Sequence, residues 1–250
     1  MPVAYSYCIK KRFWFQMWSL IGMFLAVPAA AEFSATLNGT TNYVYRGYSK
    51  SDDHPVAQIN LDYEHEKSGL YLGVWTSMVD FGEDEDEFDD PTRVEIIPYI
   101  GWSYPLFDDW RFETFATRYI YAGKIFGHSA DYNEFLWRLH FQDLVTAQIA
   151  WAPNYFSHGQ SVLDYEVSMR YPITHAVEIS GTLGFNQARD VLEYDYLYWD
   201  AGFSWFFKYL ALDFRYVQSA YPTPEAKKIP WPYDPHKLDP TFVFSISVGF

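Results

Sequence analysis

The last ten residues of the chain, TFVFSISVGF, alternate between large apolar side chains and small or polar ones. Phe242, Phe244, Ile246, Val248 and Phe250 occupy every second position. Successive side chains of a β-strand point to opposite faces, so this pattern predicts a strand with one apolar face. A strand of about ten residues is also long enough to cross a bilayer at a tilt. One such strand is compatible with the edge of a soluble sheet as well, so the rest of the chain has to decide.

The same alternation recurs along the chain and predicts twelve strands. In residues 132–141, for example, Phe135 and Trp137 alternate with Glu134 and Arg138. An even number of strands is typical of single-chain bacterial barrels. The predicted strands span residues 33–48, 56–64, 70–80, 92–104, 110–121, 132–141, 145–154, 162–171, 176–186, 196–205, 210–219 and 242–250.

The connections between these strands alternate in length. Those after the second, fourth, sixth, eighth and tenth strands span only three to five residues. Those after odd-numbered strands are mostly longer and include residues 81–91, 122–131, 187–195 and 220–240. Short periplasmic turns that alternate with long external loops are typical of outer-membrane barrels. We therefore predict an all-β chain that forms one transmembrane, antiparallel, up-and-down β-barrel of about 12 strands, with both termini on the periplasmic side.

Periodicity alone does not say which face of each strand points inward, because a lipocalin-like barrel keeps its apolar side chains inside. Phe, Trp and Tyr make up 21% of the chain, which fits a barrel with aromatic girdles at both membrane interfaces. After Val27 no apolar run is long enough to predict a transmembrane helix. An exported chain of this kind can span a membrane only as a closed barrel, so we expect apolar side chains to face lipid. Arg118 falls on the lipid-facing parity, where it either snorkels to the outer interface or marks a bulge.

The N-terminus has the pattern of a secretory signal peptide. Lys10, Lys11 and Arg12 precede an apolar run over residues 13–27, and three alanines at 29–31 provide an A-x-A cleavage site. We expect residues 1–31 to be removed and residues 32–250 to form the barrel. The single cysteine, Cys8, leaves with the signal peptide, so we predict no disulfide in the mature chain.

Charge excludes one class of partner. Loss of three basic residues with the signal peptide changes the formal net charge from −14 to −17. Nucleic-acid binding requires basic patches, so we predict no nucleic-acid partner for so acidic a chain. The expected partners are the lipid bilayer of the outer membrane and small solutes or ions.

Several motifs resemble known outer-membrane proteins. The terminal strand that ends on Phe250 resembles the closing strand of bacterial outer-membrane barrels. Residues 42–81 resemble the opening of the TorF-family porins, with Tyr45-Arg46-Gly47, a proline-led strand start at 55–58, Asp62-Tyr63-Glu64-His65 and the segment SGLYLGVW at 68–75. Val56 stands between Pro55 and Ala57, which departs slightly from that pattern. The segment ISGTLGFNQARDVLEYDYLYWDAGFSWFF resembles the family's glycine-aromatic hairpin. The resemblance implies an outer-membrane barrel with a porin role.

The polar parity of each strand predicts the side chains that line the lumen. Acidic residues outnumber basic ones in this set, which favours a mild preference for cations if the pore is open. Register counting across two turns pairs Arg170 with Glu178 and Asp200 with Arg215, and such cross-strand pairs contribute roughly 0.2–1 kcal/mol each. The predicted lumen residues are Arg46, Asp62, Glu64, Arg93, Glu95, Arg111, Glu113, Glu134, Arg138, His140, Asp164, Glu166, Arg170, Glu178, Asp200, Asp213 and Arg215. The same residues are compatible with a polar plug that holds a narrow barrel together.

Metal and catalytic sites have little support in the sequence. The acidic loop over residues 80–90 lacks the spacing of an EF-hand, and solvated loops commonly have this composition. His54, His128, His158 and His236 fall in predicted external loops without ligand spacing. His140 lies on the inward parity, and no serine stands beside it. We therefore predict no metal, no cofactor and no enzymatic activity.

The sequence favours a porin-like channel of the bacterial cell outer membrane, which passes small solutes or ions through a narrow, mildly acidic lumen. The alternative is a non-conducting outer-membrane barrel with a structural, adhesive or ligand-binding role. The proline-rich loop over residues 220–240 is compatible with a constriction and with an external binding surface.

Overall fold

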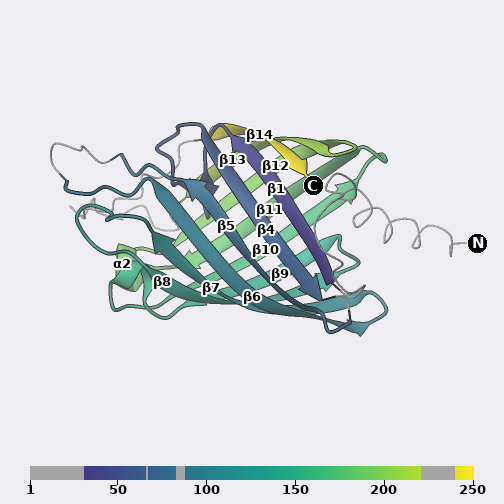
Figure 1. Ribbon diagram of the computed structural model, residues 1–250, viewed down its shortest axis with the longest axis horizontal. Coiled ribbons are helices and arrows are strands. Elements are labelled where there is room, and N and C mark those ends of the chain that lie inside the picture. The colour runs from purple at the N-terminus through teal and green to yellow at the C-terminus, as the bar shows by residue number, and fades with distance from the viewer. Residues whose placement is uncertain (1–30, 66, 83–87, 221–239) are drawn as a thin grey trace, which may run out of the picture.

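The computed structural model describes residues 31–65, 67–82, 88–220 and 240–250. Twelve of its strands form one closed antiparallel barrel, in which each strand pairs with its neighbours along the chain and β1 pairs with β14 (Figure 1). These strands are β1 (Ala31–Thr40), β4 (Val56–His65), β5 (Leu70–Met78), β6 (Val94–Phe107), β7 (Trp110–Tyr121), β8 (Tyr132–Phe141), β9 (Val145–Ala152), β10 (Val162–Pro172), β11 (Val177–Gln187), β12 (Tyr196–Phe207), β13 (Leu210–Ala220) and β14 (Thr241–Gly249). The predicted fold class and strand number are confirmed.

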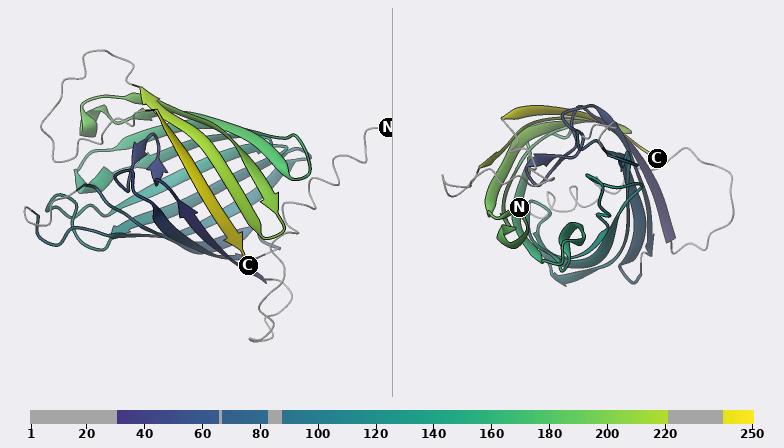
Figure 2. Two further views of the ribbon diagram at one scale, coloured as in Figure 1. Left: turned by 90° about the horizontal axis from the view of Figure 1, so that it is seen from above. Right: turned by 90° about the vertical axis from the view of Figure 1, so that its left-hand side faces the viewer.

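The two ends of the chain close the barrel. Thr36 pairs with Gly249 and Thr40 with Ser245. The last residue takes part as well, because Phe250 donates its N–H to the Ala35 carbonyl at 2.8 Å and accepts from the Ala35 N–H at 3.2 Å. In the end-on view of Figure 2 the strands form a continuous ring.

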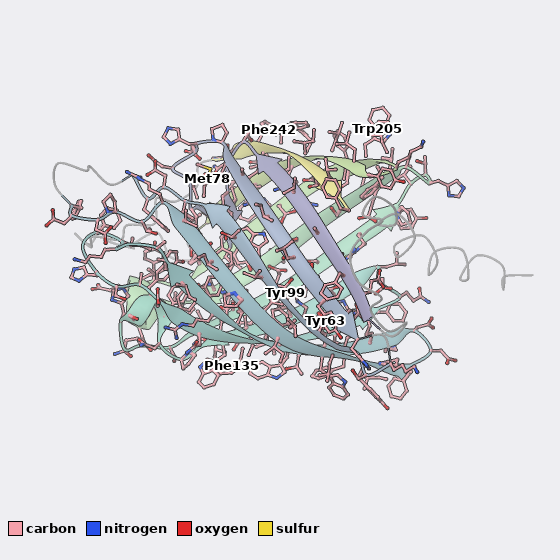
Figure 3. The ribbon with its side chains drawn as sticks, viewed as in Figure 1. Tyr63, Met78, Tyr99, Phe135, Trp205 and Phe242 are labelled. Atoms are coloured by element: carbon pink, nitrogen blue, oxygen red, sulfur yellow. The ribbon has the colours of Figure 1, made fainter. Side chains whose placement is uncertain are left out.

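The faces of the strands follow the predicted parity. Phe135, Trp137 and Leu139 of β8 are each exposed by 37–39% on the outside, whereas the intervening Glu134 is 1% exposed. Figure 3 shows Phe135, Trp205 and Phe242 directed away from the barrel. A closed barrel with an apolar exterior and polar interior is the arrangement that a bilayer requires.

The first predicted strand, residues 33–48, is wrong at its C-terminal end. β1 ends at Thr40, which pairs with Val56 at the start of β4. Residues 41–55 therefore form an insert between two adjacent wall strands. Within it, the short strands β2 (Val44–Tyr45) and β3 (Tyr48–Ser49) form a hairpin inside the ring of wall strands (Figure 2). Tyr43 and Tyr45 continue the alternation of apolar and polar residues seen in β1. The alternation therefore predicted a wall strand that extends into this insert.

The barrel has a turn end and a loop end. At the turn end, connections such as residues 108–109 and 208–209 are tight turns. At the loop end, longer connections include the 3₁₀-helix η1 (Tyr155–Ser157) and the short helix α2 (Arg189–Leu192). No helix in the described ranges is long and apolar enough to cross a membrane. Residues 1–30 of the expected signal peptide, residues 83–87 of the acidic loop and residues 221–239 of the proline-rich loop lie outside the described residues.

Arg118 lies on the exterior near the loop end. Its register with Asn133 is part of an uninterrupted run of β7–β8 pairs, so the alternative of a bulge at this position is wrong. Its guanidinium lies 3.4 Å from both the Asn133 amide oxygen and the Asp131 carboxylate. A register shift occurs instead at the turn end, between Pro105 and Phe107 of β6.

The exterior assignment makes a prediction for Leu183, which is 57% exposed on β11. Leu183→Arg places a charge against acyl chains and should lower the free energy of unfolding by about 2–4 kcal/mol. Urea unfolding in lipid vesicles, followed by tryptophan fluorescence, measures the change. Leu183→Ala keeps the position apolar and serves as the control. Equal stability of the two variants would contradict the lipid-facing assignment.

Candidate functional site in the barrel lumen

The insert between β1 and β4 places a hairpin inside the loop-end half of the barrel. Arg46 and Gly47 form its turn with positive φ angles of 48° and 81°. A Cβ atom at Gly47 would lie 2.5 Å from the Tyr198 Cβ and 3.0 Å from the Ser219 Cβ, so only glycine allows the turn to approach β12 and β13 this closely. Val44, in the first strand of the hairpin, packs against Val217 and Val243 of β13 and β14.

Arg46 joins the tip of this hairpin to the opposite wall. Its Nη1 lies 2.6 Å from the Glu134 Oε1, and its Nη2 lies 3.0 Å from the Glu134 Oε2. Its Nε lies 3.2 Å from the Asp164 Oδ1. All three side chains are almost fully buried. The planar guanidinium thus binds β8 in a bidentate manner and β10 at the same time.

Lys50 makes the second buried attachment of the hairpin. Its Nζ lies 2.5 Å from the Glu95 Oε1 and donates to the Tyr121 hydroxyl at 3.1 Å. Tyr43 donates its hydroxyl to the Glu95 Oε2 at 2.9 Å, so both carboxylate oxygens are bound. Lys50 and Glu95 have no solvent-exposed side-chain surface.

Tyrosine side chains fill the space around these two ion pairs. Tyr119 of β7 stacks on Tyr132 of β8, with ring centroids 4.3 Å apart and an interplanar angle of 7°. The Tyr45 hydroxyl lies 2.8 Å from the Tyr119 hydroxyl, which ties the hairpin to β7. The Tyr48 hydroxyl lies 2.9 Å from that of Tyr155 in η1. The hairpin and these rings together fill the loop-end half of the lumen.

A cavity of about 530 Å³ adjoins the hairpin within the barrel. Hairpin residues, including Tyr43 and Gly47, contribute to its lining together with most of the wall strands. Its charged lining consists of four acidic and three basic side chains. These are Arg46, Glu134, Arg138, Glu166, Asp200, Asp213 and Arg215.

Arg215 organises one wall of the cavity. Its Nη1 lies 2.5 Å from the Asp200 Oδ1, its Nε lies 2.8 Å from the Asp213 Oδ1, and its Nη2 donates to the Ser180 hydroxyl at 2.8 Å. Arg215 faces Gly202 in the register, so the predicted direct pairing with Asp200 is wrong. The ion pair forms diagonally because the turn is centred one residue later than the sequence count assumed.

The predicted pairing of Arg170 with Glu178 is wrong for the same reason. Arg170 faces Ser180, and Glu178 faces Pro172. The β10–β11 turn is thus centred on His175, and each shift of the centre by one residue moves every partner by two positions.

Arg138 organises the facing wall. Its Nε donates to the Gln148 Oε1 at 2.6 Å, its Nη1 lies 3.3 Å from the Glu113 Oε2, and its guanidinium lies 4.5 Å from the centre of the Phe115 ring.

Two further carboxylates on the barrel wall accept hydrogen bonds from neutral groups. Glu166 accepts from Tyr198 at 3.0 Å, and Asp62 accepts from Asn60 and Tyr99.

His140 lies between a hydroxyl group and a carboxylate. The sequence does not show this arrangement, because pairing between neighbouring strands brings the three side chains together. Its Nδ1 is 2.9 Å from the Thr146 hydroxyl, and its Nε2 is 3.3 Å from the Glu113 Oε2. This order resembles a nucleophile, base and acid. The three residues are absent from the cavity lining, and Glu113 also binds Arg138 and Tyr71, so the group is best described as a structural network.

The remaining predicted lumen residues lie apart from the cavity lining. Arg93, near the loop end, binds Asp80 at 2.8 Å, and Arg111, near the turn end, binds Asp143 at 3.1 Å. Glu64, Arg170 and Glu178 also lie toward the turn end. Sequence reasoning missed Lys50 and the tyrosines of the hairpin, because they were assigned to a wall strand or its loop.

Within the described part of the chain, no group of three or more His, Cys, Asp or Glu side chains is placed to hold a metal ion. Burial, and then the neighbouring His128, lower the pKa of His158 in the loop after β9. His236 lies outside the described residues.

The buried attachment of Arg46 makes a prediction. Arg46→Ala leaves Glu134 and Asp164 buried without their cation and should cost about 3–5 kcal/mol of unfolding free energy. The control is Arg111→Ala, which removes an exposed ion pair with Asp143 and should cost no more than about 1 kcal/mol. Denaturant unfolding in detergent or lipid measures both. A cost for Arg46→Ala as small as that of the control would contradict the burial of the pair.

Comparison with known proteins agrees with this fold. A family model described as "Bacterial protein of unknown function (Gcw_chp)" matches residues 26–250. That description does not name the TorF porins, so this part of the sequence resemblance is not confirmed. Among the curated proteins none matches the chain.

Solved structures of porins and channels resemble the barrel. The structure "KdgM porin" aligns with a TM-score of 0.51 at 8% identity and covers 87% of this chain and 98% of its own. A structure of the NanC porin aligns with a TM-score of 0.50 at 10% identity, covering 86% of this chain and 98% of its own. A mutant of the TodX monoaromatic hydrocarbon channel aligns with a TM-score of 0.50 at 9% identity, covering 89% of each chain. The barrel therefore has the fold of bacterial outer-membrane porins.

Proposed function

We propose that this chain, which belongs to the Gcw_chp family, is a porin-like channel of the bacterial outer membrane for small solutes or ions. The observation that carries the proposal is the cavity of about 530 Å³, lined by polar and charged side chains inside a barrel of porin fold. Barrels of about eight strands are filled by side chains or hold one small ligand, barrels of about 16 to 18 strands enclose an aqueous channel, and twelve strands lie between these sizes. No catalytic step forms part of this proposal.

The hairpin over residues 41–55 is the constriction of the proposed channel. Thr40 pairs with Val56, so the wall is closed without the hairpin and does not need it for its backbone hydrogen bonds. The hairpin is instead held chiefly by the side chains of Arg46 and Lys50. Backbone hydrogen bonds also reach it, from the Asp80 N–H to the Lys50 carbonyl and from the Thr41 N–H to the Phe244 carbonyl, each at 2.9 Å. An insert of this kind can narrow the lumen without being part of the wall.

The charge of the lining supports a preference for cations. Arg138 and Arg215 are each bound to carboxylates, whereas Glu166 accepts hydrogen bonds only from hydroxyl groups within the described residues. The lining therefore has negative charge that its own basic residues do not balance. Acidic side chains that line a pore favour the passage of cations over anions.

A second candidate function is a non-conducting barrel, and the complete burial of Lys50 and Glu95 favours it. If the hairpin never leaves the lumen, the protein is closed to solutes and its external loops carry its role. The two functions differ in the unmodified protein, which shows conductance steps if it is a channel and none if the hairpin keeps it closed.

Removal of the hairpin should raise conductance. Replacing residues 42–54 with an Asn-Gly turn leaves Thr40 and Val56 paired and joins β1 to β4 by a short connection. We expect purified variant in planar bilayers to show larger and more frequent conductance steps than the unmodified protein. Retention of the folded band in unheated gel samples is the control for barrel formation. A folded variant that is electrically silent would contradict the channel.

The cation preference can be tested in that hairpin-deleted barrel. Glu166→Gln removes a negative charge from the cavity and should lower the cation-to-anion permeability ratio, measured as a shift of reversal potential in a salt gradient. Glu193→Gln, at an exposed position after α2, is the matched control and should leave the ratio unchanged. The same ratio in all three proteins would show that the lining does not select ions.

A further inference from the structure

The surroundings of the Lys50 ammonium resemble a binding site more than a simple ion pair. Its Nζ lies 4.3–6.0 Å from the centres of five aromatic rings. The rings belong to Tyr43, Tyr45, Tyr119, Tyr121 and Phe156. Aromatic faces attract cations through the ring quadrupole, and cages of several rings are a known means of binding ammonium groups. We refer to these five rings with Glu95 as the ammonium cage.

The polar groups of the cage complete the recognition of a primary ammonium. Such a group has three N–H donors. The Glu95 Oε1 accepts one donor and the Tyr121 hydroxyl accepts a second. The Tyr43 hydroxyl orients the carboxylate from its other side. Because the Lys50 and Glu95 side chains are fully buried, these contacts are stronger than they would be at the surface.

Most of the cage does not depend on the hairpin that delivers Lys50. Tyr119 and Tyr121 belong to β7, Glu95 belongs to β6, and Phe156 belongs to η1. Stacking between Tyr121 and Phe156, with ring centroids 5.6 Å apart, holds two of these rings together without the lysine. Lys50 itself comes from the insert over residues 41–55, which is not needed to close the wall.

We propose that the ammonium cage is a binding site for primary alkylammonium groups and that Lys50 occupies it as a tethered ligand. Occupation of the cage holds the C-terminal side of the hairpin in the lumen, as Arg46 holds its tip. The ligand class is a short, unbranched primary amine in its protonated form. Quaternary ammonium lacks the N–H donors that Glu95 and Tyr121 accept, and neutral alcohols lack the charge. This site is independent of whether the barrel conducts.

The test removes the tethered ligand and supplies it from solution. Lys50→Ala deletes three carbons and the nitrogen beyond Cβ, so n-propylammonium has the atoms of the missing group. The variant should unfold at a temperature lower by roughly 5–10 °C, because Glu95 is left buried and unpaired. Added n-propylammonium chloride should restore the unfolding temperature in a saturable manner, measured by circular dichroism of the barrel in detergent.

Three control compounds and two control proteins test whether the rescue is specific. Sodium chloride at equal ionic strength, n-propanol and tetramethylammonium chloride should each restore much less of the lost temperature. Lys124→Ala removes an exposed lysine at the loop end and should respond to none of these compounds. The unmodified protein should also show little response to n-propylammonium, because Lys50 already fills the cage.

The proposal is overturned if n-propylammonium stabilises Lys50→Ala no more than sodium chloride does, or stabilises Lys124→Ala to the same extent. If Lys50→Ala does not fold alone, the refolding yield with and without n-propylammonium becomes the measurement. Recovery of folded barrel with the amine, and not with tetramethylammonium, supports the site. No recovery with any amine counts against it.

Discussion

Every backbone N–H and C=O group of a membrane-spanning segment must find its partner within the protein, and the structure depends on this constraint. The barrel meets it by pairing each strand with its neighbours and β1 with β14. Hydrogen bonds between Ala35 and Phe250 extend the pairing to the final residue of the chain. Once the wall is closed, the alternation of side chains along each strand assigns one set to lipid and the other to the lumen.

Burial of charged side chains inside the closed wall is energetically unfavourable, because they lose their contacts with water. In this protein ion pairs and hydrogen bonds from hydroxyl groups replace those contacts. Arg46 binds Glu134 and Asp164, and Lys50 binds Glu95, at positions where burial of a single charge would be strongly unfavourable. Two cations thus attach an insert of the wall to carboxylates on β6, β8 and β10, and tyrosine rings fill the space between them.

The division of the lumen follows from these attachments. The loop-end half is filled by the hairpin and its rings, whereas a charged cavity adjoins it on the inside of the same barrel. In the proposed channel, conductance depends on the position of the hairpin and solute selection depends on the cavity. The proposed ammonium cage holds the hairpin in the filled half of the lumen, because the residue that occupies the cage, Lys50, belongs to the hairpin.

The sequence alone determined the fold, since period-two alternation, connection lengths and the pattern of the last ten residues are local properties. It also determined which face of each strand is polar, and β8 shows the predicted alternation of Phe135 and Trp137 with Glu134. Only the tertiary structure decided the registers, because a turn centred one residue later moves Arg215 from opposite Asp200 to opposite Gly202. Only the tertiary structure placed residues 41–55 inside the barrel, because Tyr43 and Tyr45 alternate as wall residues do. The carboxylates that bind Lys50 and Arg46 lie about 45 to 120 residues further along the chain. No local sequence pattern can relate residues so far apart.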